Sequence, residues 1–168
     1  QKISAARTTW LVAGLTEEAD RRYPPPPCPT DFTVLATDGS HMAVDRHRAA
    51  RCYLINIGAV TLRYGAGAEA TLESFPRLYS GEEEMVIAPA GTQNREQPIE
   101  ANLLGIKRGV DEVHRLAELA AGLAADRPAL TLVDGTLVLW GLEAYPEFVT
   151  EALLHKGLLA SLSRIEKL

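Results

Sequence analysis

A long amphipathic segment between two β-type runs is the feature that most constrains the fold of this chain. Apolar side chains recur at helical spacing from Leu103 to Ala125, and Arg127 and Pro128 end the pattern. The apolar run at residues 129–133 follows this predicted helix directly, and we expect it to be the best buried strand. A helix that joins two strands of one sheet makes a right-handed crossover, so we expect the strand after it to lie beside the first strand, in parallel.

The part of the chain before this helix predicts a meander. Three runs have β-type composition: residues 32–36, 49–64 and 70–79. In the middle run, Tyr53, Ile55 and Ile57 share one face by period two, and a glycine-rich turn at 65–67 leads into the third. The polar segment 81–98 predicts a loop. The expected fold class is therefore α/β, with a three-strand meander plus a parallel strand in one mixed sheet, covered by helices.

The ends of the chain add two further expectations. Residues 1–30 are expected to form an N-terminal helix, over 3–22, and a stiff proline-rich connector. Residues 31–168 are expected to form the core, in which Pro146 suits the first turn of a last helix. Because the sequence stops within that amphipathic pattern, we expect the core to lack a C-terminal portion.

Charge and composition narrow the classes of function. The 17 basic and 22 acidic residues give a net charge of −5, which argues against a purely charge-driven nucleic-acid binder but allows an enzyme that meets nucleic acid through a metal. No apolar run approaches the roughly 18–20 residues of a membrane span. The two cysteines, Cys28 and Cys52, lack metal-type spacing, so we expect a reducing, cytoplasmic location.

One short pattern occurs twice, each time after an apolar β-run: Thr-Asp-Gly-Ser at 37–40 and Val-Asp-Gly-Thr at 133–136. In α/β sheets ligands gather outside the carboxyl ends of the strands, so parallel neighbours would bring Asp38 and Asp134 side by side. Two unpaired carboxylates side by side repel each other, and a divalent cation between them removes that repulsion. All-oxygen ligation favours Mg²⁺ or Mn²⁺. The alternative is that each Asp-Gly pair is only a turn.

The long helix offers a third carboxylate. Its acidic residues include Asp111, Glu112 and Glu118. The helical phase places Asp111 and Glu118 on the solvated side, and Glu112 at the border of the apolar stripe, toward the sheet. Arg108 lies four residues before Glu112, so an ordinary surface ion pair is the alternative interpretation.

A basic cluster follows the first Asp-Gly motif and suggests a DNA channel, with a solvated hairpin as the alternative. Its members are His41, Arg46, His47, Arg48 and Arg51. For the aromatic residues Trp140 and Tyr145, core packing is favoured over stacking on bases.

In order and spacing, these motifs together resemble the NurA family of DNA end-processing nucleases, which have a ribonuclease H-like core. The matching stretches are residues 36–40, 53–58, Arg108 with Glu112, and 132–137, so the resemblance spans about residues 32–142. It implies a ribonuclease H-like mixed sheet and an Mn²⁺-dependent deoxyribonuclease, with Mg²⁺ as the alternative cation. The implied activities are 5′ to 3′ exonuclease and single-strand endonuclease, in DNA end processing and double-strand break repair. The implied partners are DNA, a second copy of the chain and a HerA-type hexameric ATPase, with no membrane.

Carried over by residue, the resemblance makes Asp38, Glu112 and Asp134 the catalytic metal ligands of a two-metal hydrolysis. Asp111 is the alternative to Glu112. The family also uses a later residue, commonly a histidine, which we expect beyond Leu168. Two other hypotheses remain open: a catalytically incomplete adaptor for a translocase, and an actin-like ATPase, whose loops normally place a residue between the Asp and the Gly.

Overall fold

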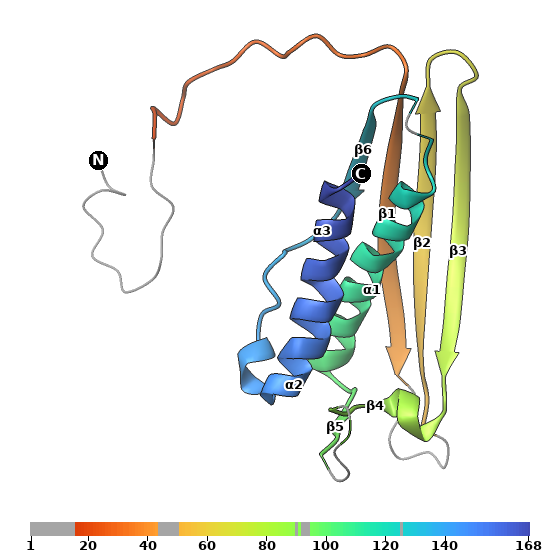
Figure 1. The fold of residues 1–168 in the computed structure, drawn as a ribbon, viewed down its shortest axis with the longest axis vertical. Coiled ribbons are helices and arrows are strands. Elements are labelled where there is room, and N and C mark those ends of the chain that lie inside the picture. The colour runs from red at the N-terminus through yellow and green to blue at the C-terminus, as the bar shows by residue number, and fades with distance from the viewer. Residues whose placement is uncertain (1–15, 44–50, 90, 92–94, 125) are drawn as a thin grey trace.

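The structure is a computed structural model that describes residues 16–43, 51–89, 91, 95–124 and 126–168. Its centre is a mixed sheet with the strand order β3-β2-β1-β6 (Figure 1). The strand bounds are β1 Phe32–Ala43, β2 Tyr53–Tyr64, β3 Glu69–Tyr79 and β6 Ala129–Val133. Strands β1, β2 and β3 form an antiparallel meander, and β6 pairs with β1 in parallel. The predicted meander, crossover and parallel fourth strand are confirmed.

The hairpin between β2 and β3 turns at the predicted glycines. Gly65 has φ +95, a backbone conformation that glycine adopts readily, and the Asp31 carboxylate accepts a hydrogen bond from the backbone N–H of Ala66 at 2.9 Å. On β2 the predicted buried face is confirmed, because Tyr53, Ile55 and Ile57 all lie in the core.

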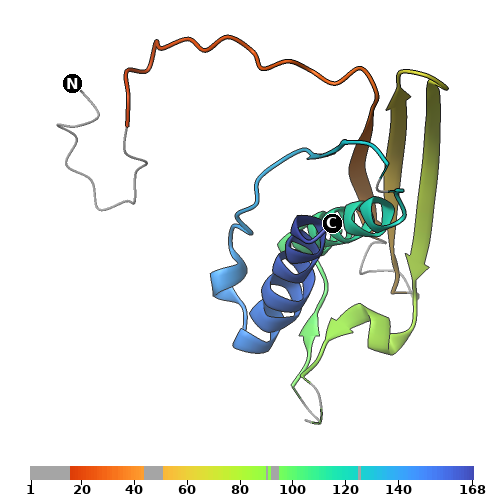
Figure 2. The same cartoon turned by 45° about the horizontal axis from the view of Figure 1, so that its top comes forward.

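The helices pack on one face of the sheet (Figure 2). Helix α1, Asn102–Ala121, is the predicted crossover helix and ends one residue before Gly122. The last helix runs without interruption through α2 (Glu147–Thr150), the π-helical stretch η3 (Glu151–Leu159) and α3 (Ala160–Glu166). As predicted, Pro146 stands at its N-terminus. The core lies between this helical layer and the sheet and includes Leu35, Ile55, Leu103, Leu104, Val110, Leu116, Val149 and Leu153.

No element of the described residues covers the opposite face of the sheet (Figure 2). The expectation that β6 is the best buried strand is wrong. Its Leu130 and Leu132 are 51% and 47% exposed. The reason is that alternate side chains of a strand point to opposite faces, and the face that holds Leu130 and Leu132 is uncovered; β6 also lies at the edge of the sheet.

Strand β1 continues beyond the position where a turn was expected. The motif 37–40 lies inside the strand, because Asp38 pairs with Gly58 and Ser40 pairs with Asn56 on β2. Regular pairing with β2 holds this backbone extended and overrides the turn preference of the Asp-Gly pair. The parallel pairing with β6 ends earlier, at Thr37 and Val133.

The remaining segments differ from expectation in two places. The predicted loop 81–98 contains a 3₁₀ turn, η1 (Glu82–Met85), and a small ladder between β4 (Val86–Ile87) and β5 (Gln97–Pro98). A second 3₁₀ turn, η2 (Leu142–Ala144), precedes the last helix.

The predicted N-terminal helix is wrong over residues 16–22, which form bends and a turn, and residues 3–15 lie outside the described residues. The connector at 24–29 is exposed and free of helix and strand. Cys28 and Cys52 are both free thiols. Among the helices that the structure describes, none has the length and apolar character needed to cross a membrane.

Candidate active site

Asp38 and Asp134 leave neighbouring parallel strands at the same end of the sheet. Thr37 pairs with Val133, the last residue of β6, so the two aspartates occupy the next position on each strand. Both line a hollow of about 700 Å³ on the uncovered face of the sheet. The side chain of Asp38 is exposed, and its Oδ1 accepts a hydrogen bond from the N–H of Gly39 at 2.9 Å. Parallel pairing therefore places the two aspartates on neighbouring strands beside one hollow.

Glu112 reaches the other side of the same strand from helix α1. Its residue exposure is only 4%, which confirms that its helical phase points toward the sheet. A Cβ added to Gly39 would lie 2.6 Å from the Oε1 of Glu112, so only a glycine allows this approach. Thr37 strengthens the contact, because its hydroxyl donates to the backbone carbonyl of Glu112 at 3.0 Å.

Arg108 is the counter-ion of Glu112. Its Nη1 donates both to the Glu112 carboxylate and to the backbone carbonyl of Gly39, the latter at 2.6 Å. Burial raises the pKa of the Glu112 carboxyl above its ordinary value. The Arg108 guanidinium and the Gly39 N–H oppose that rise in pKa, and the nearby Asp38 carboxylate adds to it. Of the two helix acids that were candidates, Glu112 is thus the one with strand β1 beside it.

The alternative helix ligand, Asp111, faces other partners. Its carboxylate accepts a hydrogen bond from Lys107 at 2.7 Å and lines a separate hollow beside Tyr79 and Glu84. Sequence spacing alone leaves either Asp111 or Glu112 as the candidate helix ligand. Their different surroundings in the structure distinguish the two.

The donor set fits a hard divalent cation by its chemistry. Carboxylate oxygens are preferred ligands of Mg²⁺ and Mn²⁺, and Gly39 lets the Glu112 carboxylate lie directly against strand β1. Within the described residues, however, no three Asp, Glu, His or Cys side chains converge closely enough to hold an ion. Glu112 instead points to Arg108. The roles of Asp38, Glu112 and Asp134 as metal ligands therefore stay predictions.

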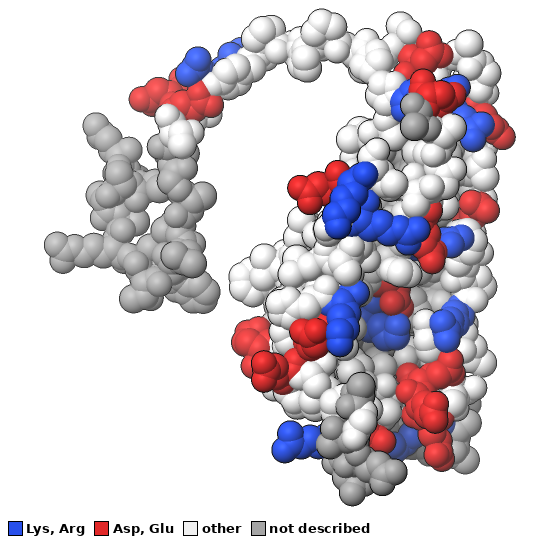
Figure 3. Space-filling model, viewed as in Figure 1, with Lys and Arg blue, Asp and Glu red and all other residues white. Residues whose placement is uncertain are grey.

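The basic cluster is described only in part. Arg46, His47 and Arg48 lie outside the described residues. Arg51 is exposed and lines a different hollow from the two aspartates, beside Tyr53. His41 lies near the end of β1, where partial burial and the Arg108 guanidinium lower its pKa. On the face that Figure 3 shows, basic and acidic side chains are interspersed rather than gathered by sign.

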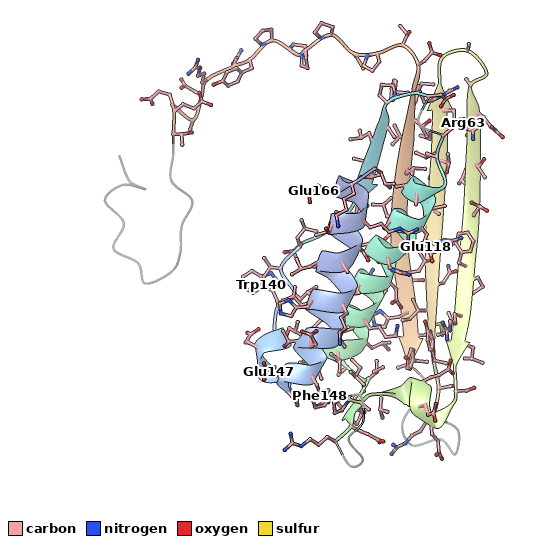
Figure 4. The ribbon with its side chains drawn as sticks, in the orientation of Figure 1. Arg63, Glu118, Trp140, Glu147, Phe148 and Glu166 are labelled. Carbon is pink, nitrogen blue, oxygen red and sulfur yellow. The ribbon has the colours of Figure 1, made fainter. Side chains whose placement is uncertain are left out.

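The two aromatic residues behave differently. Tyr145 packs against the core, as expected. Trp140 is 64% exposed, so its expected core packing is wrong. It lies on the linker between β6 and α2, away from the sheet (Figure 4), and its carbonyl accepts a hydrogen bond from the Asn102 amide at 3.3 Å. The linker borders α1, and its Leu139 packs against the core while Trp140 does not, a difference that the apolar sequence did not reveal.

Sequence reasoning missed one part of this site, the bond between Arg108 and the Gly39 carbonyl. Helical spacing predicts only a surface ion pair between Arg108 and Glu112. The available signal was the glycine in the first Asp-Gly motif, which permits a close approach from the helical layer.

Comparisons with known proteins assign the family. The family model described as the NurA domain matches residues 32–160. No curated protein matches the chain. A crystal structure of NurA aligns with 18% identity and a TM-score of 0.34 over 67% of this chain and 21% of the other, so this chain spans about a fifth of that structure. The assignment rests on the family model, which covers most of the chain. The chain therefore belongs to the NurA family of nucleases.

Proposed function

We propose that this chain is the core of a metal-dependent deoxyribonuclease that hydrolyses phosphodiester bonds in DNA. The proposed activities are 5′ to 3′ exonuclease and single-strand endonuclease, acting in DNA end processing and double-strand break repair. Membership of a nuclease family supports the general class. The observation that carries the proposal is the position of Asp38 and Asp134. Each comes directly after the last paired residue of two parallel neighbouring strands, and both line one hollow.

Asp38, Asp134 and Glu112 are the proposed ligands, and Asp38 is the natural bridging ligand because its strand is central in the sheet. When bound, two Mn²⁺ or Mg²⁺ ions would orient the scissile phosphate, activate a water and stabilise the leaving oxygen. The protein's own part is to hold carboxylates at the carboxyl ends of two rigid strands. These carboxylates supply ligand oxygens and no proton.

The proposed partners are DNA, a second copy of the chain and a HerA-type hexameric ATPase. Arg46, His47, Arg48 and Arg51 remain the proposed DNA contacts. All of these partners follow from the family resemblance.

The second candidate function is an adaptor that binds a HerA-type translocase without cleaving DNA. One observation favours it: Glu112 is paired with Arg108, and the described residues assemble no group of three potential ligands. The two candidates differ in whether the chain hydrolyses DNA when metal is supplied.

End-labelled single- and double-stranded DNA provides the test. The chain, alone and mixed with a HerA-type ATPase, is incubated with Mn²⁺, Mg²⁺ or a chelator. We expect cleavage that requires metal and that is abolished by Asp38→Asn and by Asp134→Asn. Asp126→Asn is the control, because Asp126 is an exposed aspartate outside both hollows that the candidate ligands line. ATPase binding without cleavage under any metal condition would replace the nuclease with the adaptor.

A further inference from the structure

Arg108 holds oxygen atoms from two different elements with one nitrogen atom. Its Nη1 donates to the Glu112 carboxylate on its own helix and to the Gly39 carbonyl on strand β1. Among the ion pairs of the described residues, this is the pair whose carboxylate side chain is most buried, at 6% exposed. The guanidinium is therefore the positive charge that a buried carboxylate requires.

A divalent cation at Glu112 would need the same oxygens. A carboxylate oxygen bonded to a guanidinium has fewer lone pairs left for a metal ion. A guanidinium at hydrogen-bond distance also repels a divalent cation brought to that carboxylate. The ion pair and metal ligation by Glu112 thus compete.

The ion pair borders a hollow that a second candidate ligand also lines. Arg108, Glu112 and Asp134 all line a hollow of about 300 Å³ beside α1. Asp134 also lines the larger hollow of Asp38, so it borders both spaces. Gly39, which has no side chain, is the residue of β1 that lies against Glu112. Arg108 has a long side chain that is 29% exposed, so its head group has access to water.

We propose that Arg108 is a positioning residue that holds the Glu112 carboxylate away from Asp134 until a divalent cation takes the place of its guanidinium. This inference rests on the proposed metal dependence of the nuclease. It explains why the three predicted ligands lie around one strand end yet do not converge. The exchange is a conformational latch: the cation gains Glu112, and the guanidinium moves toward solvent.

The same helix provides a matched control pair. Lys107 and Asp111 have the same charges and the same spacing of four residues as Arg108 and Glu112, and they are bonded at 2.7 Å. Asp111 does not line the hollow that contains Asp134. Removal of the Lys107 charge therefore measures how the loss of any one positive charge from this helix changes the Mn²⁺ affinity.

The test is a titration of Mn²⁺ into the DNA-free chain, with free Mn²⁺ followed by electron paramagnetic resonance. We expect Arg108→Gln to bind Mn²⁺ about tenfold more tightly than the parent chain, since it loses both the competitor and the repulsion. Lys107→Gln should leave the affinity within about twofold of the parent value. Adding Glu112→Gln to Arg108→Gln should remove the gain.

Arg108→Lys serves as the second variant in case the buried carboxylate of Arg108→Gln prevents folding, which circular dichroism would reveal. Lysine keeps the charge but lacks the planar fork, so we expect a smaller gain in Mn²⁺ affinity, of about two- to threefold. An affinity equal to or below that of the parent in the folded Arg108 variants, while the parent binds Mn²⁺, would overturn the latch alone. Absence of Mn²⁺ binding by the parent and every variant would overturn the metal-dependent function and the latch together.

Discussion

Substitution of Gly39 by alanine tests the close contact between β1 and α1. The added Cβ would lie 2.6 Å from Glu112 Oε1, 2.9 Å from Ile57 Cδ1 and 3.1 Å from Glu112 Cγ. Relieving such overpacking typically costs about 1–3 kcal/mol. Gly39 does not have a positive φ, so alanine fits its backbone and recovers about 0.4–1 kcal/mol from the unfolded state. We expect a net loss of about 1–2 kcal/mol in the free energy of unfolding.

Urea unfolding followed by far-ultraviolet circular dichroism measures this loss. Gly109→Ala is the matched control, because an added Cβ there has nothing within 4 Å and the residue lies inside α1. That substitution should stabilise the chain by about 0.5–1 kcal/mol. The double variant Gly39→Ala with Glu112→Ala should lose less stability than the sum of the two single losses, since Glu112→Ala removes the Glu112 atoms from the clash and leaves only that with Ile57. Strict additivity, or a Gly39→Ala variant as stable as the parent, would refute the contact.

Three further predictions concern other parts of the fold. Thr37→Val removes the hydroxyl that donates to a carbonyl of α1 and should cost about 1 kcal/mol in urea unfolding, whereas Thr37→Ser should retain most of the stability. Leu142→Ala should lower the free energy of unfolding by about 2–5 kcal/mol because the side chain is buried. Trp140→Ala should change it by no more than about 0.5 kcal/mol because the ring is exposed. Similar losses for the two variants in thermal unfolding would contradict the arrangement of the linker. The Arg77 guanidinium and two backbone N–H groups lower the pKa of Glu84, so its stabilising contribution is present at neutral pH and is lost as the pH falls through that lowered pKa. The difference in unfolding free energy between the parent and Glu84→Gln should therefore shrink below about pH 4. A difference that stays constant with pH would argue against the pair.

The topology was accessible from sequence because it depends on periodicity and on a general rule of handedness. The apolar stripe of α1 placed Glu112 toward the sheet, and the crossover rule placed the strand 129–133 beside the first strand. Both features are local patterns or general geometric rules, and the structure confirms them.

The details that failed depend on contacts between distant residues. The Asp-Gly pair at Asp38 has a strong local preference for a turn, but pairing with Gly58 on β2 keeps it extended. Strand β6 has the composition of a buried strand, yet its burial depends on what covers its outer face. The bond from Arg108 to the carbonyl of Gly39 joins residues 69 positions apart, so helical spacing gives no sign of it.

The end of β6 has a consequence for local motion at the candidate site. Up to Thr37, strand β1 has a neighbour on both sides, whereas from Asp38 onward β2 is its only strand partner among the described residues. The backbone at Asp38 therefore lies at the border between a doubly held and a singly held segment, and segments with fewer hydrogen-bonded neighbours open at lower free energy. Amide hydrogens of β1 should accordingly show a step in protection factor at this residue. The part of β1 before Asp38 is held on both sides and the part after it on one side. The carboxylate of Asp38 can therefore shift slightly without disturbing the core.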